Sequence, residues 1–373
     1  MAAIWRRAAL YLLALVVVAG CGRRAAPPVV TALPTSTSPA VTAVAAQPTP
    51  TLLPVATALP PATPTLLPTA TPAPTATPTA DPYAPYTIAG LAARSYGGGL
   101  LQIESTLADT PLFTRSVITY PSDGLTIYGF MNVPVGEGPF PVALVLHGYV
   151  PPENYAIMTY TTRYADTLAQ AGYLTIHPNY RNFPPSDETE AFALGRRESD
   201  YRVGYAVDVL NLMAIVREQA GQPGPLQRAD GGDIHLLGHS MGGGITLRVI
   251  TVDQNVSAAV LYGAMSGDEQ RNYEKIFEWS NGEVGANVLA TQPDVLAGIS
   301  PIYHLERITA PVSIHHGALD DTVPPAWSDE LCQLLRALQK PVECFSYADQ
   351  PHTFYGDGDQ LFQQRVLDFF SRH

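Results

Sequence analysis

Residues 234–242 read IHLLGHSMG, and this stretch decides the fold. A strand-like run leads directly into the pentapeptide GHSMG at 238–242, and a helix-compatible stretch follows from Ile245 to Ile250. A serine at a sharp turn between strand and helix exposes its hydroxyl above the sheet, and the flanking glycines avoid collisions with neighbouring backbone. The alternative is a tight turn in which the serine only caps the following helix. The surrounding pattern favours Ser240 as a nucleophile.

Short apolar runs alternate with helical patterns on both sides of this stretch. Strands that are apolar on both faces and separated by helices require a mostly parallel sheet with helices on both faces. Two more strand-like runs, 115–120 and 125–133, flank a Ser-Asp-Gly turn and predict an antiparallel hairpin at one edge. We therefore expect an α/β fold. Its parallel strands are predicted at 142–146, 173–177, 233–237, 258–262, 312–315 and 342–347.

The stretch before the hairpin, residues 86–113, is ambiguous. Its glycine run at 97–99 neither follows a strand nor opens a helix, and it lacks the Lys or acidic residue of a phosphate-binding loop. We interpret it as a flexible segment.

A serine nucleophile requires a base, an acid that orients the base, and donors for the developing oxyanion. On a sheet of this kind the acid and the histidine follow the serine in the chain, at the carboxyl ends of later strands. The strand at 312–315 leads to Asp320 and Asp321, and the strand at 342–347 leads to His352. Spacing alone leaves the two aspartates as competitors. His352 is the candidate base.

The oxyanion donors are expected to be two backbone N–H groups, those of Met241 and Tyr149. Tyr149 follows the strand at 142–146 and a small Gly148, and its ring would border the acyl pocket. The alternative is a strand-end histidine followed by an ordinary turn glycine. His315 and His316 have no third ligand at regular spacing, so neither a metal site nor a cofactor is predicted.

From about residue 117 onward the chain resembles an α/β-hydrolase of the prolyl oligopeptidase (S9) and dienelactone hydrolase type. The resemblance rests on LHGY at 146–149, NYR at 179–181, GHSMGG at 238–243, HG at 316–317 with Asp320, and PH at 351–352 with Phe354. It implies the α/β-hydrolase fold and a triad of Ser240, Asp320 and His352. It also makes four residues candidates for substrate binding, namely Tyr149, Tyr180, Arg181 and Phe354. The β-propeller common in S9 peptidases does not fit in this chain, and residues 182–186 lack the glycines usual there.

The amino-terminal part predicts export and a lipid anchor. Two arginines precede an apolar run at 8–19, and small residues then lead to Cys21, as in a bacterial lipobox. An ordinary signal peptide or an uncleaved anchor is the alternative. Residues 22–85 are rich in Pro and Thr and predict an extended stalk. The domains are therefore a signal peptide at 1–21, a disordered stalk at 22–85 and a catalytic domain at 86–373.

Two further features belong to the catalytic domain. Residues 264–303 form a possible cap over the site, with crossover helices as the alternative. Cys332, on a predicted helix, and Cys344, on the returning strand, lie at similar distances from the turn between them, which favours a disulfide in an exported protein.

The chain has 373 residues and a formal net charge of −12, which argues against a nucleic-acid partner. We expect a lipid-anchored extracytoplasmic serine hydrolase that cleaves peptide amides or esters, S9-like by resemblance. A carboxylesterase or polyester-type esterase is the alternative, and an inactive surface binding module is the least favoured one.

Overall fold

The structure, a computed structural model, describes residue 81 and residues 83–188 and 202–373. The predicted signal peptide with Cys21 and nearly all of the predicted stalk lie outside the described residues. Within the described ranges, none of the helices combines the length and the apolar character needed to cross a bilayer.

Nine strands in the described part of the chain form one mixed sheet, in the order β1-β2-β3-β5-β4-β6-β7-β8-β9. The strands from β5 to β9 pair in parallel, while β1, β2 and β3 pair antiparallel and β3 joins β5 antiparallel. The predicted fold class is confirmed. The strands are β1 (Gln102–Asp109), β2 (Phe113–Ser122), β3 (Leu125–Pro134), β4 (Phe140–Leu146), β5 (Leu174–Pro178), β6 (Ala229–His239), β7 (Ala258–Tyr262), β8 (Val312–Gly317) and β9 (Val342–Tyr347).

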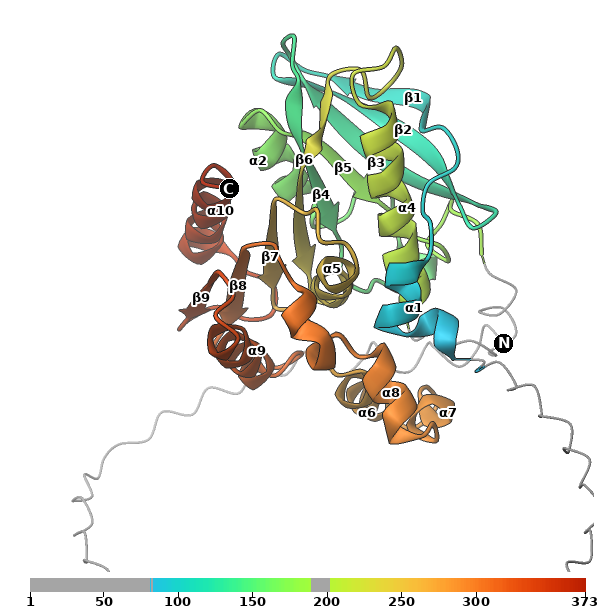
Figure 1. Cartoon of the computed structure of the whole chain (residues 1–373). Helices are drawn as coiled ribbons and strands as arrows, with labels where there is room; N and C mark the ends of the chain where they lie inside the picture. The colour runs from blue at the N-terminus through green and yellow to red at the C-terminus, as the bar shows by residue number, and fades with distance from the viewer. Residues whose placement is uncertain (1–80, 82, 189–201) are drawn as a thin grey trace, which may run out of the picture. The chain divides into compact units, whose positions relative to one another are not determined.

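Helices cover both faces of this sheet, and Figure 1 shows α2 and α10 on one side with α4 and α5 on the other. Strands such as β5 and β7 are buried along their whole length because both of their faces meet helices. The helices and 3-10 turns are η2 (Ala84–Tyr86), α1 (Ile88–Ala93), η3 (Pro152–Asn154), α2 (Thr162–Gln170), α4 (Val203–Gln219), α5 (Met241–Val252), α6 (Glu269–Trp279), α7 (Ala286–Leu289), α8 (Pro293–Ile299), η5 (Pro301–Arg307), α9 (Pro325–Ala337) and α10 (Gly356–Phe370).

The prediction that residues 86–113 form a flexible segment is wrong. These residues contain α1 and an edge strand, β1, which extends the predicted hairpin to three antiparallel strands. β1 is exposed along nearly its whole length, so its sequence carries no alternation of buried and exposed residues. The glycine run packs against the fold, since the Gly97 N–H donates to Asn211 Oδ1 at 2.9 Å.

The segment at 264–303 forms α6, α7, α8 and the start of η5. These helices contact one another, and α8 also contacts α1 while η5 contacts α5 and α9. A buried ion pair between Arg248 of α5 and Glu269 of α6 holds the segment to the central helix. That these helices form a cap over Ser240 stays a prediction.

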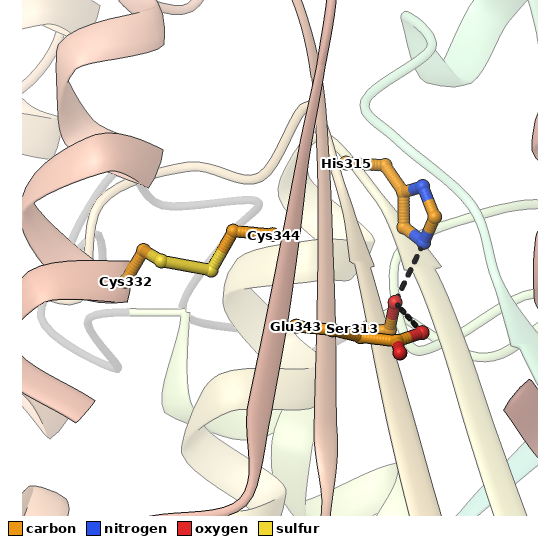
Figure 2. The surroundings of a disulfide bond; sticks show 5 residues. All are labelled: Ser313, His315, Cys332, Glu343 and Cys344. Carbon is orange, nitrogen blue, oxygen red and sulfur yellow. Dashed lines mark hydrogen bonds between the residues drawn. A yellow bond between two sulfur atoms is a disulfide. The ribbon is translucent and has the colours of Figure 1, made fainter. Parts of the chain in front are cut away.

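The two cysteines of the domain form a disulfide in the structure, joining Cys332 of α9 to Cys344 of β9 with Cα atoms 6.4 Å apart. Figure 2 shows the bond on the α9 side of the strands, with His315, Ser313 and Glu343 grouped at β8 and β9. The disulfide therefore ties the helix after β8 to the strand before the predicted base.

Candidate active site

The turn between β6 and α5 has the conformation that the GHSMG pattern predicts. Ser240 has φ 58° and ψ −118°, a strained backbone for a residue with a side chain. A Cβ atom on Gly238 would lie 2.2 Å from the Gly242 carbonyl oxygen, and one on Gly242 would lie 2.2 Å from the Leu146 oxygen. Both glycines are therefore required by contact with backbone, and the hydroxyl stands where strand becomes helix.

The three residues of the predicted triad meet at this turn. His352 Nε2 lies 2.9 Å from Ser240 Oγ, and His352 Nδ1 lies 2.7 Å from Asp320 Oδ2. Since a carboxylate only accepts, Nδ1 carries the proton and Nε2 is free to accept the proton of the serine. The Asp320 side chain is fully buried, whereas that of His352 is 17% exposed. Asp321 is exposed, so only Asp320 of the two candidate acids faces the imidazole.

Asp320 is held as an anion by the groups around it. Burial raises the pKa of this carboxyl, but hydrogen bonds from His316 and His352 outweigh burial and hold the pKa well below its usual range. Its second oxygen, Oδ1, accepts the backbone N–H groups of Thr322 at 2.9 Å and Val323 at 2.8 Å. The carboxylate is thus charged and fixed in direction across the neutral pH range.

The loop after β4 lies directly against the serine. A Cβ on Gly148 would come within 2.9 Å of Ser240 Cβ and 2.6 Å of the Tyr160 hydroxyl oxygen, so only glycine fits. Tyr149 is the residue after Gly148 in the chain. Met241 is the first residue of α5, and the first backbone N–H groups of a helix have no partner inside it. This placement is compatible with an oxyanion hole formed by Tyr149 and Met241, and that role stays a prediction.

A hydrogen-bonded chain links this loop to the loop of the base. Gly148 N–H donates to the Tyr160 hydroxyl at 3.1 Å, Tyr160 contacts His239 Nδ1, and His239 Nε2 donates to the His352 carbonyl at 2.9 Å. Burial lowers the pKa of His239 to about 3, so the ring is neutral. Because its Nε2 faces a carbonyl and carries the proton, Nδ1 accepts, and the Tyr160 O–H is the donor.

Three of the predicted substrate-binding residues are buried and engaged elsewhere. Tyr180 is fully buried and stacks on His147. Arg181 is 7% exposed and pairs with buried Asp208 at 2.7 Å. Phe354 is 1% exposed and packs in the core cluster of α2 and α10. We therefore withdraw these three residues as substrate contacts.

Tyr149 differs from them, since it is 59% exposed and directly follows Gly148, which lies against Ser240. Its ring meets Phe183 edge to face, with centroids 6.3 Å apart. It is the predicted substrate-binding residue that has an accessible side chain.

Neither Tyr160 nor His239 was predicted from the sequence to take part in the site, and His316 was considered there only as a metal ligand. Tyr160 lies in a loop without a motif, and its contact with Gly148 depends on tertiary folding, so no signal identified it. His316 did carry a signal, because it lies four residues before Asp320 at the end of β8.

Residues 127–370 match the dienelactone hydrolase family. The chain belongs to this family. A protein of Escherichia coli O157:H7, named provisionally as a carboxymethylenebutenolidase, is 24% identical over 73% of this chain and 92% of its own length. The peptidase YtmA of Bacillus subtilis strain 168, which is uncharacterized, is 25% identical over 64% of this chain and 85% of its own length.

Solved structures of two kinds share the fold. The acetyl xylan esterase of Paenibacillus sp. R4 has a TM-score of 0.57 at 18% identity, covering 77% of this chain and 92% of its own. The acylaminoacyl peptidase of Pyrococcus horikoshii has a TM-score of 0.56 at 22% identity, covering 70% of this chain and 42% of its own. With a serine at the turn after β6, this member of the dienelactone hydrolase family is a serine hydrolase.

Proposed function

We propose that this member of the dienelactone hydrolase family hydrolyses carboxylic esters and peptide amides through an acyl-enzyme on Ser240. The observation that carries the proposal is the continuous contact from Ser240 Oγ through His352 to buried Asp320, at 2.9 Å and 2.7 Å. These distances fall within the hydrogen-bond reach that a nucleophile and its general base require.

In the proposed reaction Ser240 Oγ attacks the carbonyl carbon while His352 Nε2 takes its proton. The oxyanion that forms is held by the backbone N–H groups of Tyr149 and Met241, and Asp320 stabilises the imidazolium. His352 then returns the proton to the leaving alcohol or amine as the bond to it breaks. Water attacks the acyl-serine with His352 again as the base, which releases the carboxylic acid and restores the serine.

The exposed ring of Tyr149 supports an apolar acyl group on the substrate. The ring follows Gly148, which lies against Ser240, and it meets Phe183 edge to face, so an acyl chain or an apolar side chain would cover aromatic surface. Both an ester and a peptide with such a group fit this proposal.

Parallel assays of p-nitrophenyl esters and peptide p-nitroanilides test the substrate class. We expect both to be cleaved by the full chain, with faster turnover of esters because their leaving group is better. Peptide cleavage that Ser240→Ala abolishes would support the peptidase. Ester cleavage with no amide cleavage would restrict the proposal to a carboxylesterase.

A binding module without turnover is the remaining alternative, and an active-site probe separates it from an enzyme. A fluorophosphonate reacts only with a serine that a working base activates. We expect it to label the wild type and not Ser240→Ala. A folded wild type that stays unlabelled would contradict the proposal and favour binding.

We further propose that the protein is exported and held to the bacterial membrane through lipid on Cys21. The apolar run before small residues and Cys21 supports this, together with the Pro- and Thr-rich segment that follows. Fractionation of cells expressing the full chain tests it. Wild type is expected with the membranes and Cys21→Ser in the soluble fraction, whereas equal partitioning would contradict the anchor.

A further inference from the structure

The buried acid of the site contacts two imidazoles. Asp320 Oδ2 lies 2.7 Å from His352 Nδ1 and 2.9 Å from His316 Nε2. A serine hydrolase needs only the first of these contacts for its relay. The second histidine belongs to β8 and is 4% exposed, and its ring nitrogens contact Asp320, Val323 and Ser328.

The surroundings of His316 determine which of its nitrogens carries a proton. Nε2 faces two acceptors, the Asp320 carboxylate and the Val323 carbonyl at 3.1 Å. That nitrogen is therefore protonated and donates. Nδ1 lies 2.6 Å from Ser328 Oγ, a hydroxyl that either donates or accepts. His316 is thus a donor to Asp320 in both its neutral and its charged form.

The neighbouring elements hold this ring in place. Successive residues of a strand point to opposite faces, so His315 turns toward the Tyr347 hydroxyl while His316 turns toward Ser328 of α9. One turn after Ser328, Cys332 joins α9 to β9 through the disulfide. The partner of His316 is therefore on a helix with a covalent tie to the strand that leads to His352.

We propose that His316 is a positioning residue that acts through Asp320, donating a second hydrogen bond that fixes the carboxylate and weakens its hold on the His352 imidazolium. The proposal rests on the proposed function, because it takes Asp320 as the acid of the triad. It assigns a role in tuning the base to a residue that does not touch the substrate.

The sign of the effect follows from competition for one oxygen. A carboxylate that shares its charge with a second donor stabilises the imidazolium of His352 less, so the hydrogen bond from His316 should place the acid limb of activity at lower pH. Asp320 contacts two titratable groups, His316 and His352. His239 contacts the His352 carbonyl, and the charge of Arg163 acts on His239. Removal of the His316 side chain takes a hydrogen-bond donor away from Asp320 Oδ2, so the acid limb of the kcat/KM profile moves to higher pH.

Two variants at position 316 separate tuning from packing. His316→Leu removes the donor, while His316→Gln keeps an amide N–H at about the place of Nε2. We expect the midpoint of the acid limb of kcat/KM to rise by about one pH unit in the Leu variant. The Gln variant is expected to stay near the wild-type midpoint. An unmoved midpoint in a folded, fluorophosphonate-labelled His316→Leu variant would overturn the proposal.

The wild type gives a second readout that no folding defect affects. A long-range nitrogen–proton correlation spectrum of its histidine rings is expected to show His316 protonated at Nε2 from pH 6 to pH 8. A ring protonated only at Nδ1 would overturn the proposal even if hydrolysis is intact. Absence of labelling and turnover in the wild type would instead overturn the proposed function, and this inference with it.

Discussion

Removal of the Tyr160 hydroxyl tests whether the loop that carries the proposed oxyanion donor, Tyr149, is held through His239. Tyr160→Phe deletes one oxygen, the atom that accepts the Gly148 N–H at 3.1 Å and donates to His239 Nδ1. Both partners are then left without this hydrogen bond. A buried polar group that loses its partner costs about 1–3 kcal/mol, so with two such groups the free energy of unfolding should fall by about 2–6 kcal/mol.

The same change is expected to slow the chemical step. Gly148 immediately precedes Tyr149, so release of the Gly148 N–H displaces Tyr149, whose own N–H is the proposed donor to the oxyanion. Loss of one such donor costs about 100- to 1000-fold in kcat, and displacement costs less. We expect kcat to fall about 10- to 100-fold with KM changed less than about three-fold, since the contact is used mainly in the transition state.

Tyr96→Phe is the matched control, because its hydroxyl donates to the Leu91 carbonyl at 2.8 Å, in the amino-terminal part of the domain. Stopped-flow or steady-state hydrolysis of a p-nitrophenyl ester gives kcat and KM, and urea unfolding gives stability. A Tyr160→Phe variant that is destabilised like the control but retains wild-type kcat would refute the link between this chain and the oxyanion loop. A variant that keeps both wild-type stability and wild-type kcat would refute the hydrogen-bond assignment itself.

Three other predictions follow from the same contacts. Ser240→Ala is expected to lower kcat for aryl esters by at least about 10⁴-fold, as measured by hydrolysis, and to leave the melting temperature within about 3 °C of wild type, as measured by calorimetry. Turnover near the wild-type rate in this variant would place the nucleophile elsewhere. The disulfide is expected to contribute about 2–4 kcal/mol to the free energy of unfolding, because it closes a loop with a sequence separation of 12. Chemical unfolding of the reduced protein, or of a Cys332→Ser and Cys344→Ser double variant, measures this loss. An unchanged unfolding midpoint would show that the bond does not stabilise the fold. Burial lowers the pKa of His147 to about 4 and that of His315 to about 3, so below about pH 6.5 these rings take up protons on unfolding, and the free energy of unfolding should fall by about 1.4 kcal/mol per pH unit for each ring as the pH drops toward 4. Urea titrations of His315→Gln should show a smaller pH dependence of this free energy. A pH dependence equal to that of the wild type would contradict the assignment.

The sequence is sufficient to predict most of the sheet because its central strands are apolar on both faces and separated by helices. Every predicted strand is present, and β7 and β9 have the predicted bounds. β1 was missed because an edge strand exposed on both faces lacks the periodic pattern that predicts strands. The turn at Ser240 was predictable from local sequence, since backbone crowding permits only glycine at 238 and 242.

The surroundings of the site were less predictable, for a physical reason. The resemblance placed Tyr180, Arg181 and Phe354 near the substrate, but their side chains point into the core, and side-chain direction depends on packing that a motif does not record. Tyr160 and His239 contact the site through partners on separate segments of the chain. Their neighbours had to be known before the hydrogen-bond donors could be assigned.

The central claim is that the hydroxyl of Ser240 carries the acyl group of the substrate. Acid quenching of the wild type during hydrolysis of a p-nitrophenyl ester, followed by proteolysis and mass spectrometry, measures this directly. The account predicts one added acyl group on the peptide that contains Ser240 and none in Ser240→Ala. An acyl group on a different residue, or rapid hydrolysis in which both proteins remain unmodified at every quench time, would contradict it.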